Sequence, residues 1–212
     1  MSANKNLLFA LVAGLAFLQT PAARAAEAAP FWVTNAAPRL QARIVREGGP
    51  GLRTVNRAYI NRATNRFALI VPDGYRVDYS DPQRISLVST DYNSIITFFV
   101  NDYFPATGDA DDSYRQFLLT KYPKAFVGRQ FSLAAGDTSG PAFDLQWKSE
   151  GGMPRRGWFG FMPARAGVLQ FELISSPQKF ETVRSDFEFV LATFRQSDAN
   201  GKLNVPLMSD KL

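Results

Sequence analysis

The chain has 212 residues, of which 46% are hydrophobic and 13% aromatic, as expected for one globular domain. It contains neither cysteine nor histidine, which excludes disulfides, thiolate or Ser-His-Asp catalysis, and metal sites built on Cys or His. The net charge of +5 is mildly basic and is not by itself the signature of a nucleic-acid-binding protein. A hard cation such as Ca²⁺ could still bind carboxylates, and no other cofactor is predicted.

Residues 1–25 have the pattern of a secretory signal peptide. Lys5 gives a positive start, residues 7–18 are apolar, and Ala23 and Ala25 form an A-x-A cleavage site. Twelve apolar residues would span about 18 Å as a helix, whereas a bilayer core needs roughly 30 Å. We therefore predict an exported protein, periplasmic or secreted, with no stable membrane insertion after cleavage. The cleaved chain would keep 22 basic and 19 acidic residues, a net charge of about +3.

Residues 26–64 are predicted to be an N-terminal linker that precedes the folded domain. Prolines and a Gly-Gly-Pro-Gly run interrupt this segment. Residues 39–46 (RLQARIVR) allow a short basic helix, but we favour a surface spacer. The domain itself is predicted over residues 65–196, and residues 197–212 are predicted to form a flexible polar tail.

Three strands and a helix are predicted in the first half of the domain. The run 67–71 is apolar and ends in a Pro-Asp-Gly turn. Residues 85–89 and 94–100 are separated by a short polar turn, so they are predicted to form a hairpin. Residues 113–122 carry apolar side chains at helical spacing, and a proline follows them.

Four further strands and a final helix are predicted in the second half. Alternation of apolar and polar side chains marks strands over residues 127–133, 143–147 and 169–173, and a Gly-Gly turn leads into a strand over residues 155–162. The last helix is predicted to have a Ser cap, a proline in its first turn and one apolar face. That face consists of Phe180, Val183, Phe187, Val190, Leu191 and Phe194. Short links favour antiparallel pairing. The predicted fold class is therefore α+β, a mainly antiparallel sheet of six to seven strands flanked by helices in an α/β sandwich.

Two short motifs were tested for chemistry. Ser176 and Lys179 match the S-x-x-K pattern of acylating enzymes, but the partner K-T-G motif is missing and the serine stands at a predicted helix cap. An EF-hand loop that started at Asp109 would need Gly where Tyr114 stands and Glu where Thr120 stands. Neither of the glycine-rich phosphate-binding motifs, G-x-G-x-x-G and G-x-x-x-x-G-K-S/T, occurs in the sequence. The motifs therefore predict no catalytic residue, and Ca²⁺ remains a minor alternative.

The segment 151–162 (GGMPRRGWFGFM) is the most unusual in the chain. It combines two adjacent arginines with a tryptophan, and Arg and Trp are enriched at interface hot spots. We predict Arg155, Arg156 and Trp158 as a contact site for a partner. The alternative is a hairpin with a solvated basic tip and a strand whose aromatic side chains fill the core.

Two sequence patterns resemble a known family. The domain opens with F-x-L-x-V-P-D-G-Y over residues 67–75, and near its end a strand runs through Ser175-Ser176-Pro177 into a helix that closes on Phe194. This arrangement resembles the PsbP-like family, which includes the DcrB-like envelope proteins of bacteria, over residues 65–195. The resemblance implies a PsbP-like sandwich and a non-enzymatic accessory or binding role, although a fold does not define a function. DcrB-like proteins are often lipoproteins, and this chain has no cysteine for such an anchor.

Three functions are compatible with the sequence. The leading hypothesis is a soluble, exported, non-enzymatic accessory domain that binds a protein partner in the cell envelope. The second is a carrier or sensor of a small apolar or anionic ligand, which would require a pocket of about 300 Å³ or more lined by aromatic side chains. The third is a hydrolase that uses carboxylates or the Ser–Lys pair, which would require a cleft with two carboxylates in strained environments.

Overall fold

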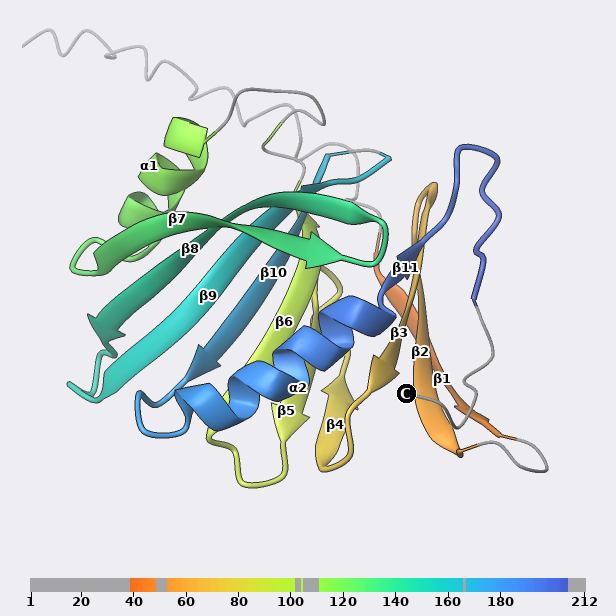
Figure 1. Ribbon diagram of the computed structural model, residues 1–212, viewed down its shortest axis with the longest axis horizontal. Helices are drawn as coiled ribbons and strands as arrows, with labels where there is room; N and C mark the ends of the chain where they lie inside the picture. The colour runs from red at the N-terminus through yellow and green to blue at the C-terminus, as the bar shows by residue number, and fades with distance from the viewer. Residues whose placement is uncertain (1–38, 49–52, 102–103, 105–110, 166, 206–212) are drawn as a thin grey trace, which may run out of the picture. The chain divides into compact units, whose positions relative to one another are not determined.

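The computed structural model describes residues 39–48, 53–101, 104, 111–165 and 167–205. Two antiparallel sheets and two helices lie in this part of the chain (Figure 1). The predicted signal peptide and most of the predicted linker lie outside the described residues. Neither described helix is long and apolar enough to cross a membrane.

The larger sheet has seven strands, each antiparallel to its neighbours. Its strands are β4 (Tyr75–Asp78), β5 (Ile85–Ser89), β6 (Ser94–Asn101), β7 (Phe126–Ala135), β8 (Thr138–Lys148), β9 (Pro154–Pro163) and β10 (Val168–Ser175). Their order across the sheet is β4-β5-β6-β10-β9-β8-β7. The predicted hairpin is confirmed as β5 and β6, and the α+β class with mainly antiparallel strands is confirmed.

A second sheet of four strands was not predicted. It consists of β1 (Gln41–Glu47), β2 (Val55–Arg62), β3 (Asn65–Val71) and β11 (Arg195–Gln196), in the order β1-β2-β3-β11. Two predictions are therefore wrong. Residues 39–46 are not a helix or a spacer, because most of them belong to β1. The segment up to residue 64 is not a linker where it forms β1 and β2. Leu40, Ala58 and Ile60 are buried in the core, and frequent arginines obscured the alternation in the sequence.

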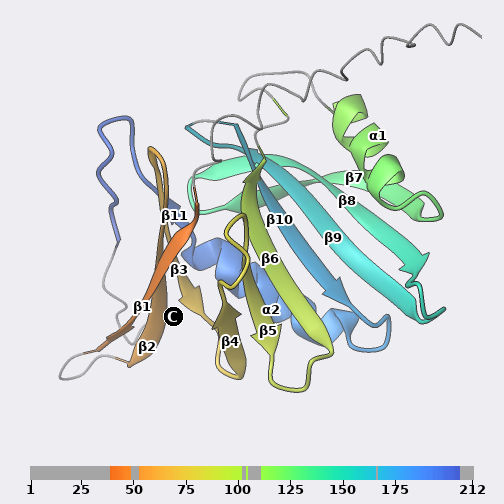
Figure 2. The same ribbon diagram turned by 180° about the vertical axis from the view of Figure 1, so that it is seen from behind.

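The two helices cover opposite faces of the seven-stranded sheet. α1 (Asp111–Lys121) packs with Val168 of β10, whereas α2 (Phe180–Thr193) packs with Leu169 of the same strand. Successive side chains of a strand point to opposite faces. Figures 1 and 2 show α2 in front of the sheet in one view and behind it in the other.

α2 closes the main core, which lies between the two sheets. The predicted apolar face is confirmed, because Phe180, Val183, Phe187, Val190 and Leu191 are buried. Phe194, directly after the helix, packs on Phe67 and Phe171 with ring centroids 5.6 and 5.0 Å apart. The predicted serine cap is wrong. Ser176 and Lys179 form a turn before the helix, and the capping residue Lys179 makes no side-chain cap bond.

A second core lies beneath α1 and is mostly aromatic. We call it the aromatic cluster; its rings are Phe104, Tyr114, Phe117, Phe143, Phe159 and Phe161. Tyr114 stacks on Phe161 with centroids 4.2 Å apart and planes 9° apart, and Phe104 meets both rings edge to face. Aromatic pairs in these geometries add attraction beyond the burial of area.

The predicted tail is not wholly without structure. Ser197 is buried, and its N–H donates to the carbonyl of Arg66. The carboxylate of Asp198 accepts hydrogen bonds from the backbone N–H groups of Asn200 and Lys202, which closes a turn. The folded part of the chain therefore extends past residue 196. Residues 206–212 lie outside the described part.

Candidate functional site

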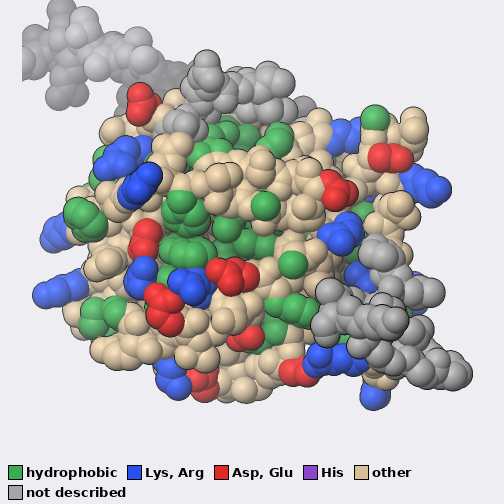
Figure 3. All heavy atoms as spheres, viewed as in Figure 1, with side chains coloured by type: hydrophobic (Ala, Val, Ile, Leu, Met, Phe, Trp, Pro, Cys, Tyr) green, Lys and Arg blue, Asp and Glu red, His purple; other side chains and the backbone are tan. Residues whose placement is uncertain are grey.

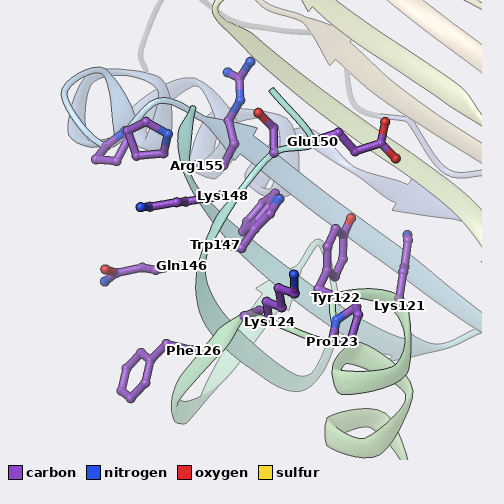
Figure 4. Close-up of a pocket in the computed structure, with 14 residues that line it drawn as sticks. Lys121, Tyr122, Pro123, Lys124, Phe126, Gln146, Trp147, Lys148, Glu150 and Arg155 are labelled. Atoms are coloured by element: carbon purple, nitrogen blue, oxygen red, sulfur yellow. The ribbon is translucent and has the colours of Figure 1, made fainter. Parts of the chain in front are cut away.

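The candidate site is a notch at the end of the seven-stranded sheet. β7 and β8 pair as far as Phe126 and Gln146, but β8 runs two residues further, to Lys148. The chain that precedes β7 turns away toward α1 instead of continuing beside β8. The opening left between them, which we call the notch, has a volume of about 940 Å³. Its walls are residues 121–126 on one side and residues 146–150, 154, 155 and 177 on the other (Figure 4).

Local sequence explains why β7 leaves its partner here. Pro123 follows α1 and cannot supply the N–H that another helical turn needs, so the helix ends at Lys121. Ala125 then donates its N–H to the carbonyl of Tyr122 in a tight turn. Just inside β7 the register shifts between Val127 and Gln130, which makes a β-bulge. A bulge bends and twists its strand, which is common at sheet edges and beside binding sites.

Aromatic side chains line part of the notch. The rings of Tyr122 and Trp147 have centroids 4.9 Å apart and lie beside each other in Figure 4. Phe159 of the aromatic cluster supports both, at 5.3 Å from Tyr122 and 6.0 Å from Trp147. Phe126, at the start of β7, is an exposed aromatic residue with 68% of its surface accessible. The notch therefore has an apolar wall that is rigid on one side.

Positive charge surrounds this wall. Of the described residues, Lys121, Lys124, Lys148 and Arg155 line the notch, together with one carboxylate, that of Glu150. In the described part of the chain an ion pair is found for Lys121 alone among these cations. Figure 3 shows Lys and Arg side chains among apolar ones along the left edge of the molecule, where β8 ends and β9 begins in Figure 1.

Lys121 joins the notch to a buried polar cluster. Its Nζ lies 2.6 Å from an oxygen of Glu172, whose side chain is only 5% exposed. Gln170 donates a hydrogen bond of 2.7 Å to the same oxygen and accepts one of 3.2 Å from Asn101. Burial, followed by the negative charge of Glu172, raises the pKa of Tyr122. The Tyr122 hydroxyl therefore stays protonated at neutral pH, when it can donate a hydrogen bond but cannot act as a base.

The structure separates the three residues predicted as a partner site. Arg155 lines the notch, whereas Arg156 and Trp158 point to the opposite face of β9. Arg156 binds Asp144 at 2.6 Å and Glu181 at 3.1 Å, and its guanidinium lies 4.1 Å from the centre of the Phe180 ring. It links β8, β9 and α2. Whether the three residues bind a partner stays a prediction.

A second, smaller depression lies on the α2 side of β7 and β8. Its volume is about 310 Å³, and it is lined by Phe126, Gly128, Arg129, Phe131, Asp144, Gln146 and Trp158. Trp158 packs on Phe131 with centroids 4.8 Å apart and donates its indole N–H to Asp144 at 3.4 Å. Phe126 and Gln146 line both openings. The two openings therefore adjoin each other at the start of β7.

Most residues of the notch were missed from the sequence. The sequence pattern places Tyr122 on a helix face and Trp147 in a strand, and it does not single out Lys124 or Lys148. A signal existed, because the segments 121–124 (KYPK) and 146–148 (QWK) both place an aromatic residue beside lysine. Nothing local shows that the two segments meet. Tyr122 and Trp147 are 25 positions apart in the sequence, whereas their ring centroids are 4.9 Å apart in space.

The notch is suited to binding rather than to acid–base chemistry. Among the described residues that line it, Glu150 is the one carboxylate, whereas the hydrolase hypothesis requires two. Ser176 and Lys179, the S-x-x-K pair, lie in a turn where the Lys179 N–H donates to the Ser176 carbonyl at 3.1 Å. In the described residues no group of three acidic side chains gathers in a way that could hold a metal ion. Unpaired cations beside aromatic rings bind anions that carry an apolar part.

Comparison with known proteins was made for the whole chain. No protein-family model matches the sequence, and no curated protein matches it. Among solved structures, the chain is similar to PA94, a protein of unknown function from Pseudomonas aeruginosa. The identity is 17%, the match covers 59% of this chain and 88% of that chain, and the TM-score is 0.41. It is also similar to the PsbP of a cyanobacterium, CyanoP from Synechocystis, with 14% identity, coverages of 76% and 93%, and a TM-score of 0.46.

A third similar structure is LpqN, a protein involved in cell envelope biogenesis of Mycobacterium tuberculosis. The identity is 16%, the coverages are 75% of this chain and 92% of that chain, and the TM-score is 0.39. A PsbP, a member of the family that the sequence patterns resemble, is thus among the structures to which this chain is similar. Identities of at most 17% and TM-scores of at most 0.46 in these three carry no argument about function.

Proposed function

We propose that this protein is an exported, non-catalytic binding domain, and that its notch takes an anionic ligand with an apolar or aromatic part. The observation that carries the proposal is the position of three cations around one aromatic wall. Lys124, Lys148 and Arg155 line the same opening as the Tyr122–Trp147 pair. The part of the chain that the structure describes provides no ion pair for these three cations.

The physical properties of the notch support this function. Hydrogen bonds between a cation and an anionic ligand are roughly twice as strong as neutral ones. A volume of about 940 Å³ lies within the range of ligand sites, and it exceeds the size that the carrier hypothesis required. That hypothesis placed the ligand between sheet and helix, whereas this opening lies at the end of the sheet. Export is supported by the signal-peptide pattern of residues 1–25.

The test uses an aromatic anion, 1-naphthalenesulfonate, and its neutral counterpart, 1-naphthalenemethanol. Isothermal titration calorimetry would compare the purified chain with the triple variant Lys124→Gln, Lys148→Gln, Arg155→Gln. We expect the triple variant to bind the sulfonate at least about tenfold more weakly, and we expect added salt to weaken binding to the unmodified chain. The neutral compound should bind both proteins alike.

A matched control removes the same number of charges from exposed positions outside the notch. Arg165, Lys179 and Lys202 serve this purpose, each changed to Gln. The control triple should bind the sulfonate as the unmodified chain does. Equal losses in the two triple variants would show that net charge alone attracts the anion, and the proposed site would then be abandoned.

A further inference from the structure

One backbone edge faces the notch and has no partner strand among the residues that the structure describes. Opposite residues of an antiparallel pair alternate between hydrogen-bonded and non-hydrogen-bonded. The N–H of Ser149 donates to the carbonyl of Met153, so the next pair, Lys148 and Pro154, is the non-bonded kind. Pro154 has no N–H, which agrees with this assignment. The N–H and C=O of Lys148 therefore point away from β9, toward the side on which β7 would lie.

β7 does not reach this edge. Its last pair with β8 is Phe126 with Gln146, and no residue of the described chain pairs with Lys148 on that side. The backbone donor and acceptor of Lys148 thus open into the notch. Unpaired edge groups of this kind form the template to which an extended peptide can add by main-chain hydrogen bonds.

The route along this edge leads from the notch into the second depression. Phe126 and Gln146 line both openings. A ligand too long for the notch alone would therefore pass beside these two residues into the second depression. Each opening has a tryptophan, Trp147 in the notch and Trp158 in the depression. Apolar side chains of a ligand could therefore contact a tryptophan at two places along one path.

Charge along the path is positive at both ends. Lys124, Lys148 and Arg155 stand at the notch, and Arg129 lines the second depression. The acid of that depression, Asp144, is held by Arg156 at 2.6 Å, which offsets its repulsion of an anion. A ligand with acidic groups spaced along its length complements this distribution.

We infer that the natural ligand of the notch is an extended acidic segment of a partner protein, which adds to the Lys148 edge and continues past Phe126 into the second depression. The inference rests on the proposed function and specifies the class of its ligand. Acidic side chains of the segment bind the cations, and its aromatic or apolar side chains contact Trp147 and Trp158. A polypeptide is favoured over a small carrier ligand or a lipid headgroup because it alone supplies a backbone for the Lys148 edge.

The test uses the hexapeptide acetyl-Glu-Phe-Glu-Ser-Phe-Glu-amide and tryptophan fluorescence. The chain has three tryptophans, so Trp32→Phe combined with Trp158→Phe leaves Trp147 as the reporter, and Trp32→Phe combined with Trp147→Phe leaves Trp158. We expect the peptide to change the fluorescence of both reporters, and each change to saturate as the peptide concentration rises. A peptide with Gln in place of Glu should bind at least tenfold more weakly.

Two comparisons isolate the backbone contact. The peptide N-methylated at alternate backbone nitrogens keeps its charges and rings but cannot pair as a strand, and we expect at least a tenfold loss of affinity. In the protein, Lys148→Pro removes the same charge as Lys148→Gln and also removes the edge N–H, so it should weaken binding further than Lys148→Gln does. Circular dichroism would establish that both variants fold, and the N-methylated peptide answers the question if the Pro variant does not.

The outcomes separate this inference from the function on which it rests. Equal binding of the N-methylated and unmethylated peptides, or a response from Trp147 alone, would overturn the extended-peptide ligand and leave the anion site standing. Binding to phosphatidylglycerol vesicles with none to the peptide would also overturn it, in favour of a lipid headgroup. Failure of both the peptide and 1-naphthalenesulfonate to bind would remove the proposed function itself.

Discussion

The aromatic cluster beneath α1 and the notch beside it are built from the same kinds of residue, but they use them differently. In the cluster, Tyr114 and Phe161 stack at 4.2 Å and both are buried. In the notch, Phe126 is 68% exposed and Lys148 has no ion pair in the described chain. The difference arises where β7 leaves β8. Over the paired strands a helix packs on the side chains, whereas at the unpaired end of β8 the side chains stay open to solvent.

The largest effect that this comparison predicts is on stability. Phe161→Ala removes a buried ring that contacts four other rings of the cluster, and we expect it to lower the free energy of unfolding by about 3–5 kcal/mol. Phe126→Ala, the matched change in the notch, should alter it by no more than about 0.5 kcal/mol. Urea denaturation measures both. Similar losses in the two variants would mean that the notch is part of the core.

A smaller effect separates two neighbours on β9. Arg156→Ala breaks contacts with Asp144, Glu181 and the Phe180 ring, so we expect a loss of about 1–2 kcal/mol of stability. Arg155→Ala should leave stability within about 0.5 kcal/mol and weaken binding of 1-naphthalenesulfonate instead. Thermal unfolding and calorimetry on the same samples test this division of roles, which the reverse pattern would contradict.

The smallest effect concerns Asp91, a carboxylate that is exposed like the cations of the notch but is held by hydrogen bonds. Hydrogen bonds from Ser89 and then Asn93 lower the pKa of Asp91 to about 2. A carboxyl with a lowered pKa stabilises the fold above its unfolded-state pKa and loses that contribution as pH falls through its folded-state value. The stability difference between the unmodified chain and Asp91→Asn should therefore shrink between about pH 4 and pH 2. Urea midpoints at several pH values measure it, and a constant difference would argue against the lowered pKa.

Several features could be predicted because short stretches of sequence carry them. The buried face of α2 repeats at helical spacing from Phe180 to Leu191, and the β5–β6 hairpin has two apolar runs around a polar turn. The four-stranded sheet was not predicted, because its first strand lacks such a pattern. In β1 the arginines at positions 43 and 46 fall on opposite faces, so no clean period of two remains to distinguish a strand from a basic helix.

By itself, the sequence determined the α+β class, most strands of the larger sheet, both helices and the lack of Cys and His chemistry, since these depend on composition and local period. Only the tertiary structure decided that β1, β2, β3 and β11 form a separate sheet and that Tyr122 meets Trp147. It also placed Arg155 and Arg156 on opposite faces of one strand, with different surroundings. Such features depend on which strands pair and where pairing stops, and these contacts join segments far apart in the chain.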